Sequence, residues 1–244
     1  MVRARRQPGA SIAVGTRLID VYRRLYAQYG PQHWWPGDGP FETIVGAILT
    51  QNTAWVNVER AMKGLKEARA MTPRRLRELS QDDLAAIIRS SGYFNSKARK
   101  LKAFANHVGE HYDDDLCALF SQGLAPLRIE LLSIYGIGRE TADDIILYAA
   151  GKPSFVIDSY TIRILQRLGL GPGGTAYDDF QALFHKNLDP DPDMFNEYHA
   201  LLDRHAAETC RKSPLCGDCC LLEVCLEGRE AVQAGREAYR RRKP

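Results

Sequence analysis

The chain has 244 residues, a length that suggests one large domain or two small ones. Its composition, 45% hydrophobic and 26% charged, is ordinary for a soluble globular protein, and a net charge of +3 does not by itself indicate a nucleic-acid partner. The basic N-terminus lacks the apolar core of a signal peptide, and no run approaches the roughly 18 apolar residues of a membrane span, so we expect a cytoplasmic protein and no membrane partner.

Helical periodicity dominates the chain from its N-terminal part onward. Residues 14–29 place apolar side chains on one stripe, and the predicted helix ends at Gly30 and Pro31. Residues 33–40 are rich in glycine and proline and are predicted to form a loop. Further helices are predicted over 41–49, 52–70 (starting near Thr53), 96–112 and 127–133, with helix starts at Thr72 and Ser80. Strand signals are thin, so the predicted fold class is all-α.

Trp34 and Trp35 are adjacent in the predicted loop. Two tryptophans in an exposed loop are unfavourable unless they line a pocket or pack against a core. Covering the start of the helix at Phe41 is the simpler explanation.

The segment 131–142, LLSIYGIGRETA, predicts a short helix, a Gly-Ile-Gly turn and a second helix. Two glycines around one apolar residue let the backbone adopt positive φ, and Ile137 would fill the gap between the helices. The amides of the turn and of the following helix start can converge on an anion such as a phosphate. An ordinary helix–turn–helix corner would show the same pattern.

An apolar run, 155–157, leads to Asp158 and then to a predicted helix over 161–168. Asp158 can be the N-cap of this helix, which stabilises it by about 1 kcal/mol. It can also be a reactive carboxylate at the mouth of a cleft.

Four cysteines follow the pattern C-x5-C-x2-C-x5-C, namely Cys210, Cys216, Cys219 and Cys225. Four thiolates this close can surround a tetrahedral zinc ion or an iron–sulfur cluster. A disulfide framework is the alternative, but such frameworks are typical of small secreted domains that lack a core. The spacing therefore predicts a metal centre.

The hairpin, Asp158 and the cysteine loop together resemble the endonuclease III-like branch of the helix-hairpin-helix (HhH-GPD) DNA glycosylase superfamily, over about residues 15–227. The family hairpin reads L-x-G-[VI]-G-x-x-T-A, with a catalytic aspartate at the spacing of Asp158. The resemblance implies a two-lobed fold: one helical lobe over 33–153 that ends in the hairpin, and a second over 1–32 plus 154–244. DNA would cross the cleft between the lobes, with Asp158 in it.

The family's cysteine loop, 210–225 here, holds a [4Fe–4S] cluster, so the resemblance favours this cofactor over zinc. The family usually has six residues between its first two cysteines, whereas this chain has five. Because Cys220 adjoins Cys219, it stands as an alternative ligand.

Bifunctional members of the family carry a hairpin lysine that attacks the sugar and forms a Schiff base. Glu140 occupies that position, so the resemblance implies hydrolysis without a lyase step, with Asp158 stabilising positive charge on the sugar. Such an enzyme suits a base that is already a good leaving group. The segment Trp34-Trp35-Pro36 resembles the corresponding segment of the 3-methyladenine glycosylases of this branch. The resemblance implies that the two tryptophan rings hold a cationic alkylated purine.

For DNA contacts, the resemblance implies that Gln51 and Tyr93 enter the gap left by an extruded base, although a helix kink and a core aromatic are simpler explanations. It implies backbone contacts from Gly136, Ile137, Gly138, Arg139, Thr141 and Lys97. The expected partner is double-stranded DNA with a damaged base, bound by a monomer at a bacterial or archaeal nucleoid.

Two alternatives stay open. One is a different lesion, an oxidised pyrimidine or a mismatched adenine, although no long recognition domain follows Cys225. The other is a catalytically inactive protein that binds damaged or bent DNA, since Glu140 would place a negative charge where phosphates approach.

Overall fold

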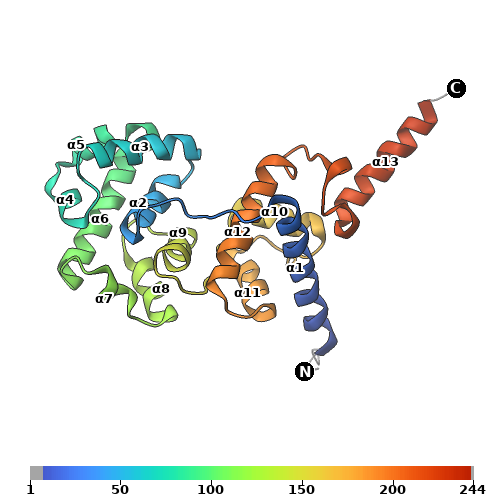
Figure 1. Cartoon of the computed structure of the whole chain (residues 1–244), viewed down its shortest axis with the longest axis horizontal. Helices are drawn as coiled ribbons and strands as arrows, with labels where there is room; N and C mark the ends of the chain where they lie inside the picture. The colour runs from blue at the N-terminus through green and yellow to red at the C-terminus, as the bar shows by residue number, and fades with distance from the viewer. Residues whose placement is uncertain (1–7, 243–244) are drawn as a thin grey trace. The chain divides into compact units, whose positions relative to one another are not determined.

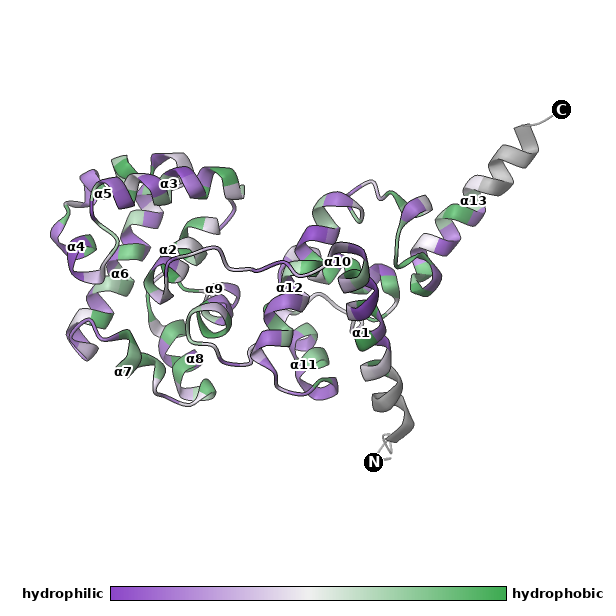
Figure 2. Ribbon diagram, in the orientation of Figure 1, coloured by the Kyte–Doolittle hydropathy of each residue, from purple (hydrophilic) through white to green (hydrophobic). Residues whose placement is uncertain are grey.

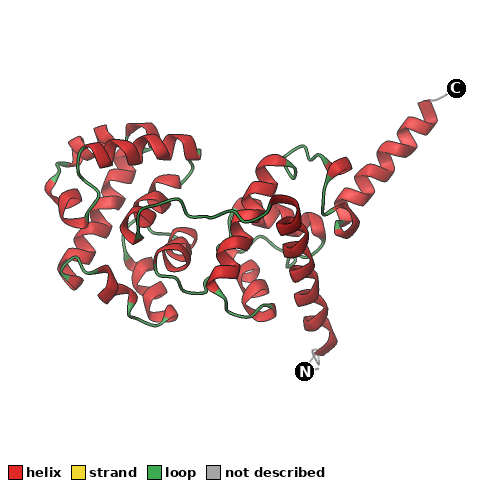
Figure 3. Ribbon diagram, in the orientation of Figure 1, coloured by secondary structure: helices red, strands yellow, loops and turns green. Residues whose placement is uncertain are grey.

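The computed structural model describes the backbone of residues 8–242 and the side chains of residues 14–235. This part of the chain contains helices and no strand (Figures 1 and 3). It divides into two compact units: residues 35–154 form the central unit, and the described residues on either side form the flanking unit. The all-α class is confirmed. The central unit spans 35–154 where the sequence indicated 33–153, and this shift assigns Trp34 and Trp35 to different units.

The central unit is a bundle of mostly short helices around one apolar core. In chain order they are α2 (Pro40–Thr50), α3 (Trp55–Glu67), α4 (Pro73–Glu78), α5 (Gln81–Ile87), the 3-10 turn η1 (Arg89–Ser91), α6 (Phe94–Tyr112), α7 (Leu116–Phe120), α8 (Leu124–Ser133), α9 (Arg139–Asp144) and the π-helical η2 (Ile145–Ala149). The long helix α6 packs against α4 and α5, while α2 packs against α3 and η2.

Local sequence signals explain where these helices begin. The side chains of Thr72 and Ser80 accept hydrogen bonds from backbone amides three residues later, which confirms the two predicted helix starts. The helix predicted over 127–133 begins earlier, at Leu124. Pro126 lies in its first turn, where a missing amide costs no intrahelical hydrogen bond.

The flanking unit contains α1 (Pro8–Tyr29), α10 (Ser159–Leu168), α11 (Tyr177–Asn187), α12 (Pro192–Glu208), the 3-10 turns η3 (Cys216–Asp218) and η4 (Leu222–Val224), and α13 (Leu226–Arg242). Helix α1 packs on α11 and α12, and α10 packs on α12 and α13. In the core the Phe155 and Phe184 rings stack with centroids 3.5 Å apart. The buried Tyr198 hydroxyl donates to the Leu18 carbonyl at 2.9 Å, which joins α12 to α1.

Hydrophilic and hydrophobic residues are interspersed along the helices of both units (Figure 2). Within the described residues, no helix combines the length and the apolar character needed to cross a membrane.

Candidate functional site

A polar depression in the central unit brings together the hairpin, the loop after α2 and the start of α6. One hollow is lined by Gln51, Asn52, Lys100, Gly136, Gly138, Arg139, Glu140 and Thr141. A second is lined by Gln51, Asn52, Tyr93, Ser96, Lys97 and Lys100. Because the two hollows share Gln51, Asn52 and Lys100, the predicted loops and the hairpin form one continuous surface.

The two hairpin glycines have different conformations. Gly136 has φ +82°, and a Cβ added there would lie 2.2 Å from Cγ of Lys100. Gly138 has extended backbone, with φ −90° and ψ −177°, and a Cβ there would meet no atom within 4 Å. The prediction of positive φ is therefore confirmed for Gly136 and wrong for Gly138. The turn is open to solvent at Gly138.

The side chains of Ile137 and Thr141 point into the unit, so neither side chain can itself contact phosphate at the surface. Ile137 is 5% exposed, fills the gap between the helices as predicted, and its amide donates to the Ile134 carbonyl at 3.1 Å. Thr141 is 4% exposed, and its hydroxyl accepts a hydrogen bond from Gln51. Neither side chain reaches the surface, whereas Gly138, Arg139 and Glu140 are exposed.

The side chain of Gln51 fastens the loop after α2 to the hairpin. Its Nε2 donates to Oγ1 of Thr141 at 2.8 Å and to the carbonyl of Gly136 at 3.2 Å. Its Oε1 accepts from the amine of Lys100. Every polar atom of the Gln51 amide therefore has a partner in the central unit.

Lys97 is buried, which corrects its predicted contact with phosphate. The side chain is 1% exposed, and its amine donates to the Leu49 carbonyl at 2.7 Å, to Oγ1 of Thr53 at 2.6 Å and to the Ser91 carbonyl at 2.7 Å. Burial, and then the nearby charge of Lys100, lower the pKa of Lys97 to about 8.

Tyr93 projects from the surface at the start of α6. Its side chain is 74% exposed, and its backbone adopts φ +44° directly after Gly92 at φ +63°. Left-handed backbone is uncommon for a bulky residue and costs on the order of 1 kcal/mol. The simpler explanation of a core aromatic is therefore excluded. The strained turn presents the ring to solvent.

Other members of the basic cluster after Lys97 are divided between internal and surface roles. Lys102 donates to the carbonyls of Arg77 and Leu79 at the end of α4. Arg99 is exposed, and its guanidinium lies 5.6 Å from the ring centroid of Tyr135 in the hairpin. Arg99 is therefore a surface cation beside the depression.

Trp35 belongs to an aromatic cluster of the central unit. Its ring centroid lies 5.3 Å from Trp55, edge to face, and 5.3 Å from Tyr148. The ring rests on α2 at Gly46, where an added Cβ would lie 2.8 Å from Cζ2 of Trp35. Trp34 is half-buried and belongs to the flanking unit. The pair expected to form one pocket is thus divided between the two units.

Asp158 lies in the flanking unit, where a buried run ends and α10 begins. Its Oδ1 accepts from the Thr161 amide at 2.7 Å, which confirms the predicted N-cap. Its Oδ2 makes no hydrogen bond within the described residues. The side chain is half-buried.

Asp203 of α12 lies within electrostatic reach of both His199 and Asp158. Partial removal from water raises the pKa of Asp203, His199 opposes this shift, and the charge of Asp158 adds to it. Neither His199 nor Asp203 could be selected from the sequence, because the i, i+4 spacing on a helix is common on solvated faces.

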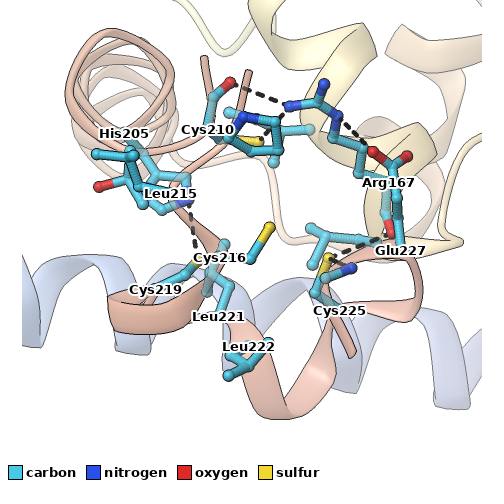
Figure 4. A pocket seen from close by; sticks show the side chains of 15 residues that line it. Arg167, His205, Cys210, Leu215, Cys216, Cys219, Leu221, Leu222, Cys225 and Glu227 are labelled. Carbon is cyan, nitrogen blue, oxygen red and sulfur yellow. Dashed lines mark hydrogen bonds and ion pairs between the residues drawn. The ribbon is translucent and has the colours of Figure 1, made fainter. Parts of the chain in front are cut away.

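The four predicted cysteines of the flanking unit line one pocket. Cys210 follows α12, Cys216 begins η3, Cys219 follows η3, and Cys225 precedes α13; Figure 4 shows all four at this pocket. The other walls are largely apolar, with Ile164, Leu168, Leu215, Leu221 and Leu222. Cys220 does not line the pocket. The geometry therefore favours Cys219 over Cys220 as a ligand.

Arg167 of α10 holds the first part of the cysteine loop in place. Its guanidinium donates to the carbonyls of Arg211 at 2.7 Å and Lys212 at 3.1 Å and to Sγ of Cys210 at 3.4 Å, and it pairs with Glu227 at 3.1 Å (Figure 4). On the opposite side, Nε2 of His205 lies 3.7 Å from Sγ of Cys219.

The lining of the pocket is compatible with the metal centre that the sequence predicts. Four thiols around an apolar space are the ligands that iron–sulfur clusters use, and four thiolates can also bind a zinc ion. Burial raises the pKa of Cys216 and Cys225, and that of Cys219 to about 11, so a metal centre would be needed to stabilise the thiolates.

Comparison with known proteins gives a consistent assignment. Residues 45–190 match the model of the HhH-GPD superfamily base excision DNA repair proteins. A protein of Methanocaldococcus jannaschii, named as a DNA repair glycosylase, is 42% identical over 210 residues, which cover 86% of this chain and 96% of the relative.

Two solved structures share the fold. A trapped Endonuclease III–DNA covalent intermediate has a TM-score of 0.77 at 21% identity and covers 89% of this chain and 98% of its own. An H. pylori 3-methyladenine DNA glycosylase bound to 1,N6-ethenoadenine has a TM-score of 0.66 at 25% identity. The match covers 81% of this chain and 97% of the H. pylori chain.

Proposed function

Because this chain belongs to the HhH-GPD superfamily of base excision DNA repair proteins, we propose that it is a monofunctional DNA glycosylase that removes an alkylated purine from double-stranded DNA. Membership of this superfamily supports the conclusion that the protein is an enzyme that acts on DNA. We propose in addition that it lacks a lyase step, that its substrate is an alkylated purine, and that its residues have the following roles.

The observation that carries the DNA-binding part is the continuous polar surface of the central unit. It places the exposed Tyr93 and the open side of the hairpin at Gly138 around Gln51. An exposed aromatic on a strained turn suits insertion between base pairs, and a helix start suits a phosphate. In the related fold, solved structures contain DNA.

We assign the chemical step to Asp158. Breaking the bond between a base and its sugar builds positive charge on the sugar, which a fixed carboxylate stabilises. The Thr161 amide fixes Oδ1, while Oδ2 can orient an attacking water or accept its proton. The proton taken from water neutralises the carboxylate as the hydroxyl bonds to the sugar and the base leaves.

Glu140 supports a reaction without strand cleavage. It is exposed at the first turn of α9, at the position of the family's lyase lysine. A carboxylate cannot form a Schiff base, so the products would be a free base and an intact abasic strand.

Support for an alkylated purine comes from the tryptophans and from one relative. Electron-rich rings attract a cationic base, worth about 1–2 kcal/mol once water is removed. The H. pylori relative is a 3-methyladenine glycosylase. Trp35 keeps its edge contact with Trp55 in this role.

The cysteine pocket would hold a [4Fe–4S] cluster through Cys210, Cys216, Cys219 and Cys225. We propose that this cluster holds the loop between α12 and α13 and takes no part in base release. The chemistry it supplies when bound is thiolate ligation of iron, which closes this loop.

The test replaces Asp158 by asparagine. An Asp158→Asn side chain keeps the N-cap acceptor but loses the charge, so we expect base release from a 3-methyladenine duplex to fall at least about 100-fold while duplex binding is retained. Asp191→Asn is the matched control, because Asp191 is the N-cap of α12 and accepts from Asp193 and Met194. Full activity of Asp158→Asn would refute the assignment.

A catalytically inactive DNA-binding protein is the second candidate, favoured by the negative charge of Glu140 at the hairpin. Release of no base from a panel of alkylated, oxidised and mismatched duplexes, with retained binding to them, would establish it instead.

A further inference from the structure

The buried amine of Lys97 joins two loops that the proposed function brings to DNA. One acceptor, the Leu49 carbonyl, lies two residues before Gln51. Another, the Ser91 carbonyl, lies two residues before Tyr93. The third, Oγ1 of Thr53, belongs to the Gln51 loop and itself donates to the Ser91 carbonyl at 2.5 Å.

The three contacts use the whole hydrogen-bonding capacity of the ammonium group, which has three donors and no acceptor. No other protein group is needed to satisfy it, and at 1% exposure it has no contact with solvent that a phosphate could replace. The amine therefore acts on the protein. Its partners lie in the last turn of α2, in the loop after α2 and at the end of η1.

Lys102, five residues further along α6, also uses its amine to bind backbone carbonyl groups, but at a different place in the central unit. Its amine donates to the Arg77 and Leu79 carbonyls at the end of α4, which carries none of the proposed DNA contacts. Lys97 and Lys102 are thus chemically similar braces on one helix. Only the Lys97 brace holds the loops of Gln51 and Tyr93.

We propose that Lys97 is a positioning residue that fixes the turn of Tyr93 relative to the loop of Gln51, so that the Tyr93 side chain is held ready to enter the duplex. Gly92 and Tyr93 are two consecutive residues with positive φ, a conformation that needs support from its surroundings. The proposal rests on the proposed function only in taking Tyr93 as the inserted side chain.

The test compares Lys97→Met with Lys102→Met in the full chain. The probes are a duplex with 2-aminopurine beside an abasic site, whose fluorescence reports local unstacking, and the single-turnover release of 3-methyladenine. For Lys97→Met we expect both signals to fall by about 10- to 100-fold, because small misplacements of inserted groups are costly. Affinity for an undamaged duplex should stay within about twofold, because Lys97 makes no phosphate contact.

Lys102→Met should keep both signals after a similar loss of thermal stability. Equal effects of the two substitutions would overturn the proposal, and so would a Lys97→Met protein with normal fluorescence. If Lys97→Met does not fold, Thr53→Val removes one acceptor and the link to Ser91, while Thr53→Ser keeps the hydroxyl. Loss of the signals in Thr53→Val and their rescue in Thr53→Ser would support the proposal, and equal behaviour would refute it.

The outcomes separate this inference from the proposed function. If the wild-type protein unstacks the 2-aminopurine probe but releases no base, the proposed glycosylase activity is refuted. The role of Lys97 can then still be tested by fluorescence. A wild-type protein that binds no duplex would overturn both.

Discussion

Gly136 and Gly138 are both glycines of the hairpin motif, yet the structure places different physical constraints on the two positions. Gly136 needs positive φ and the absence of a Cβ, since the stem of Lys100 lies directly against it. Gly138 has ordinary extended backbone and open space around it. One glycine is needed for folding, while the other leaves room for a partner.

We therefore predict that alanine substitutions at these two glycines change the free energy of unfolding by very different amounts. Gly136→Ala should lower the free energy of unfolding by about 1–3 kcal/mol through strain and overlap with Lys100. Gly138→Ala should change it by less than about 0.5 kcal/mol, because nothing in the structure opposes a methyl group there. Urea unfolding followed by circular dichroism measures both. Equal destabilisation would contradict this account of the turn.

Glu140 leads to a prediction about covalent chemistry. Borohydride traps the Schiff base between an amine and an abasic sugar, and a carboxylate offers no such amine. Wild-type protein with an abasic duplex should therefore give no trapped complex, and Glu140→Gln should behave in the same way. A trapped band of equal yield in both proteins would show that another amine of the chain acts as a lyase.

The sequence predicted several of these residues for reasons that hold locally. The cap of Asp158, the starts at Thr72 and Ser80 and the buried Ile137 follow from turn and helix chemistry within a few residues. Lys97 could not be placed this way, because its burial depends on two loops, one of them more than 40 residues earlier in the chain. A lysine beside other basic residues looks solvated until its acceptors are known.

At the scale of elements, the end of α4 is tied to the turn after α6 by one ion pair. Arg77 binds both oxygens of Asp114, at 2.5 and 2.7 Å, and also donates to the Ala105 carbonyl at 2.7 Å. Both side chains are 27% exposed, so solvent screens the pair and its contribution is about 0.5–1 kcal/mol.

This pair should give a pH-dependent contribution to stability. The hydrogen bond from Arg77 lowers the pKa of Asp114 below its ordinary value of 3.8. Above that value the folded state gains the full contribution, and it is lost as the pH falls through the folded-state pKa. Asp114→Asn should thus be less stable than wild type at pH 7, and the difference should vanish in acid. Asp113→Asn, on the exposed neighbour, is the control.

The helices of the flanking unit show where sequence reasoning fell short. Only α1 and α10 were predicted there, whereas α11, α12 and α13 were not. The predicted helices carry an apolar stripe and a clear cap or terminator. Helix α12 has Asp193 in its first turn and contains His199, Asp203 and His205. These polar residues obscure the periodicity of the buried stripe of Phe195, Tyr198 and Leu202.

At the scale of the whole molecule, the residues proposed to contact DNA and those proposed to carry out catalysis or bind a cluster belong to different units. The central unit carries the hairpin, Gln51 and Tyr93, whereas the flanking unit carries Asp158 and the cysteine pocket. The family resemblance predicted this division, since composition and net charge indicate neither a lobe boundary nor a partner. The assignment of Trp34 and Trp35 to different units followed only from the packing of Trp35 in the central unit.

The cysteine pocket allows a matched test of the ligand set. Cys219→Ser should lose the visible absorption of an iron–sulfur cluster and its bound iron, because Cys219 lines the pocket. Cys220→Ser should retain both, because the neighbouring side chain lies outside it. Iron analysis and absorption of freshly purified protein measure the outcome. Loss of iron in Cys220→Ser alone would reverse the assignment.

The contacts of Arg167 bear on the order in which the protein is assembled. One guanidinium anchors the carbonyls of Arg211 and Lys212 to α10. We therefore expect part of the conformational entropy of this loop to be lost when the helices pack, with the proposed cluster closing the rest of the loop. A zinc finger folds around its metal, whereas we expect this unit to fold first and to receive its cluster afterwards. The Cys219→Ser protein should accordingly remain a folded helical chain.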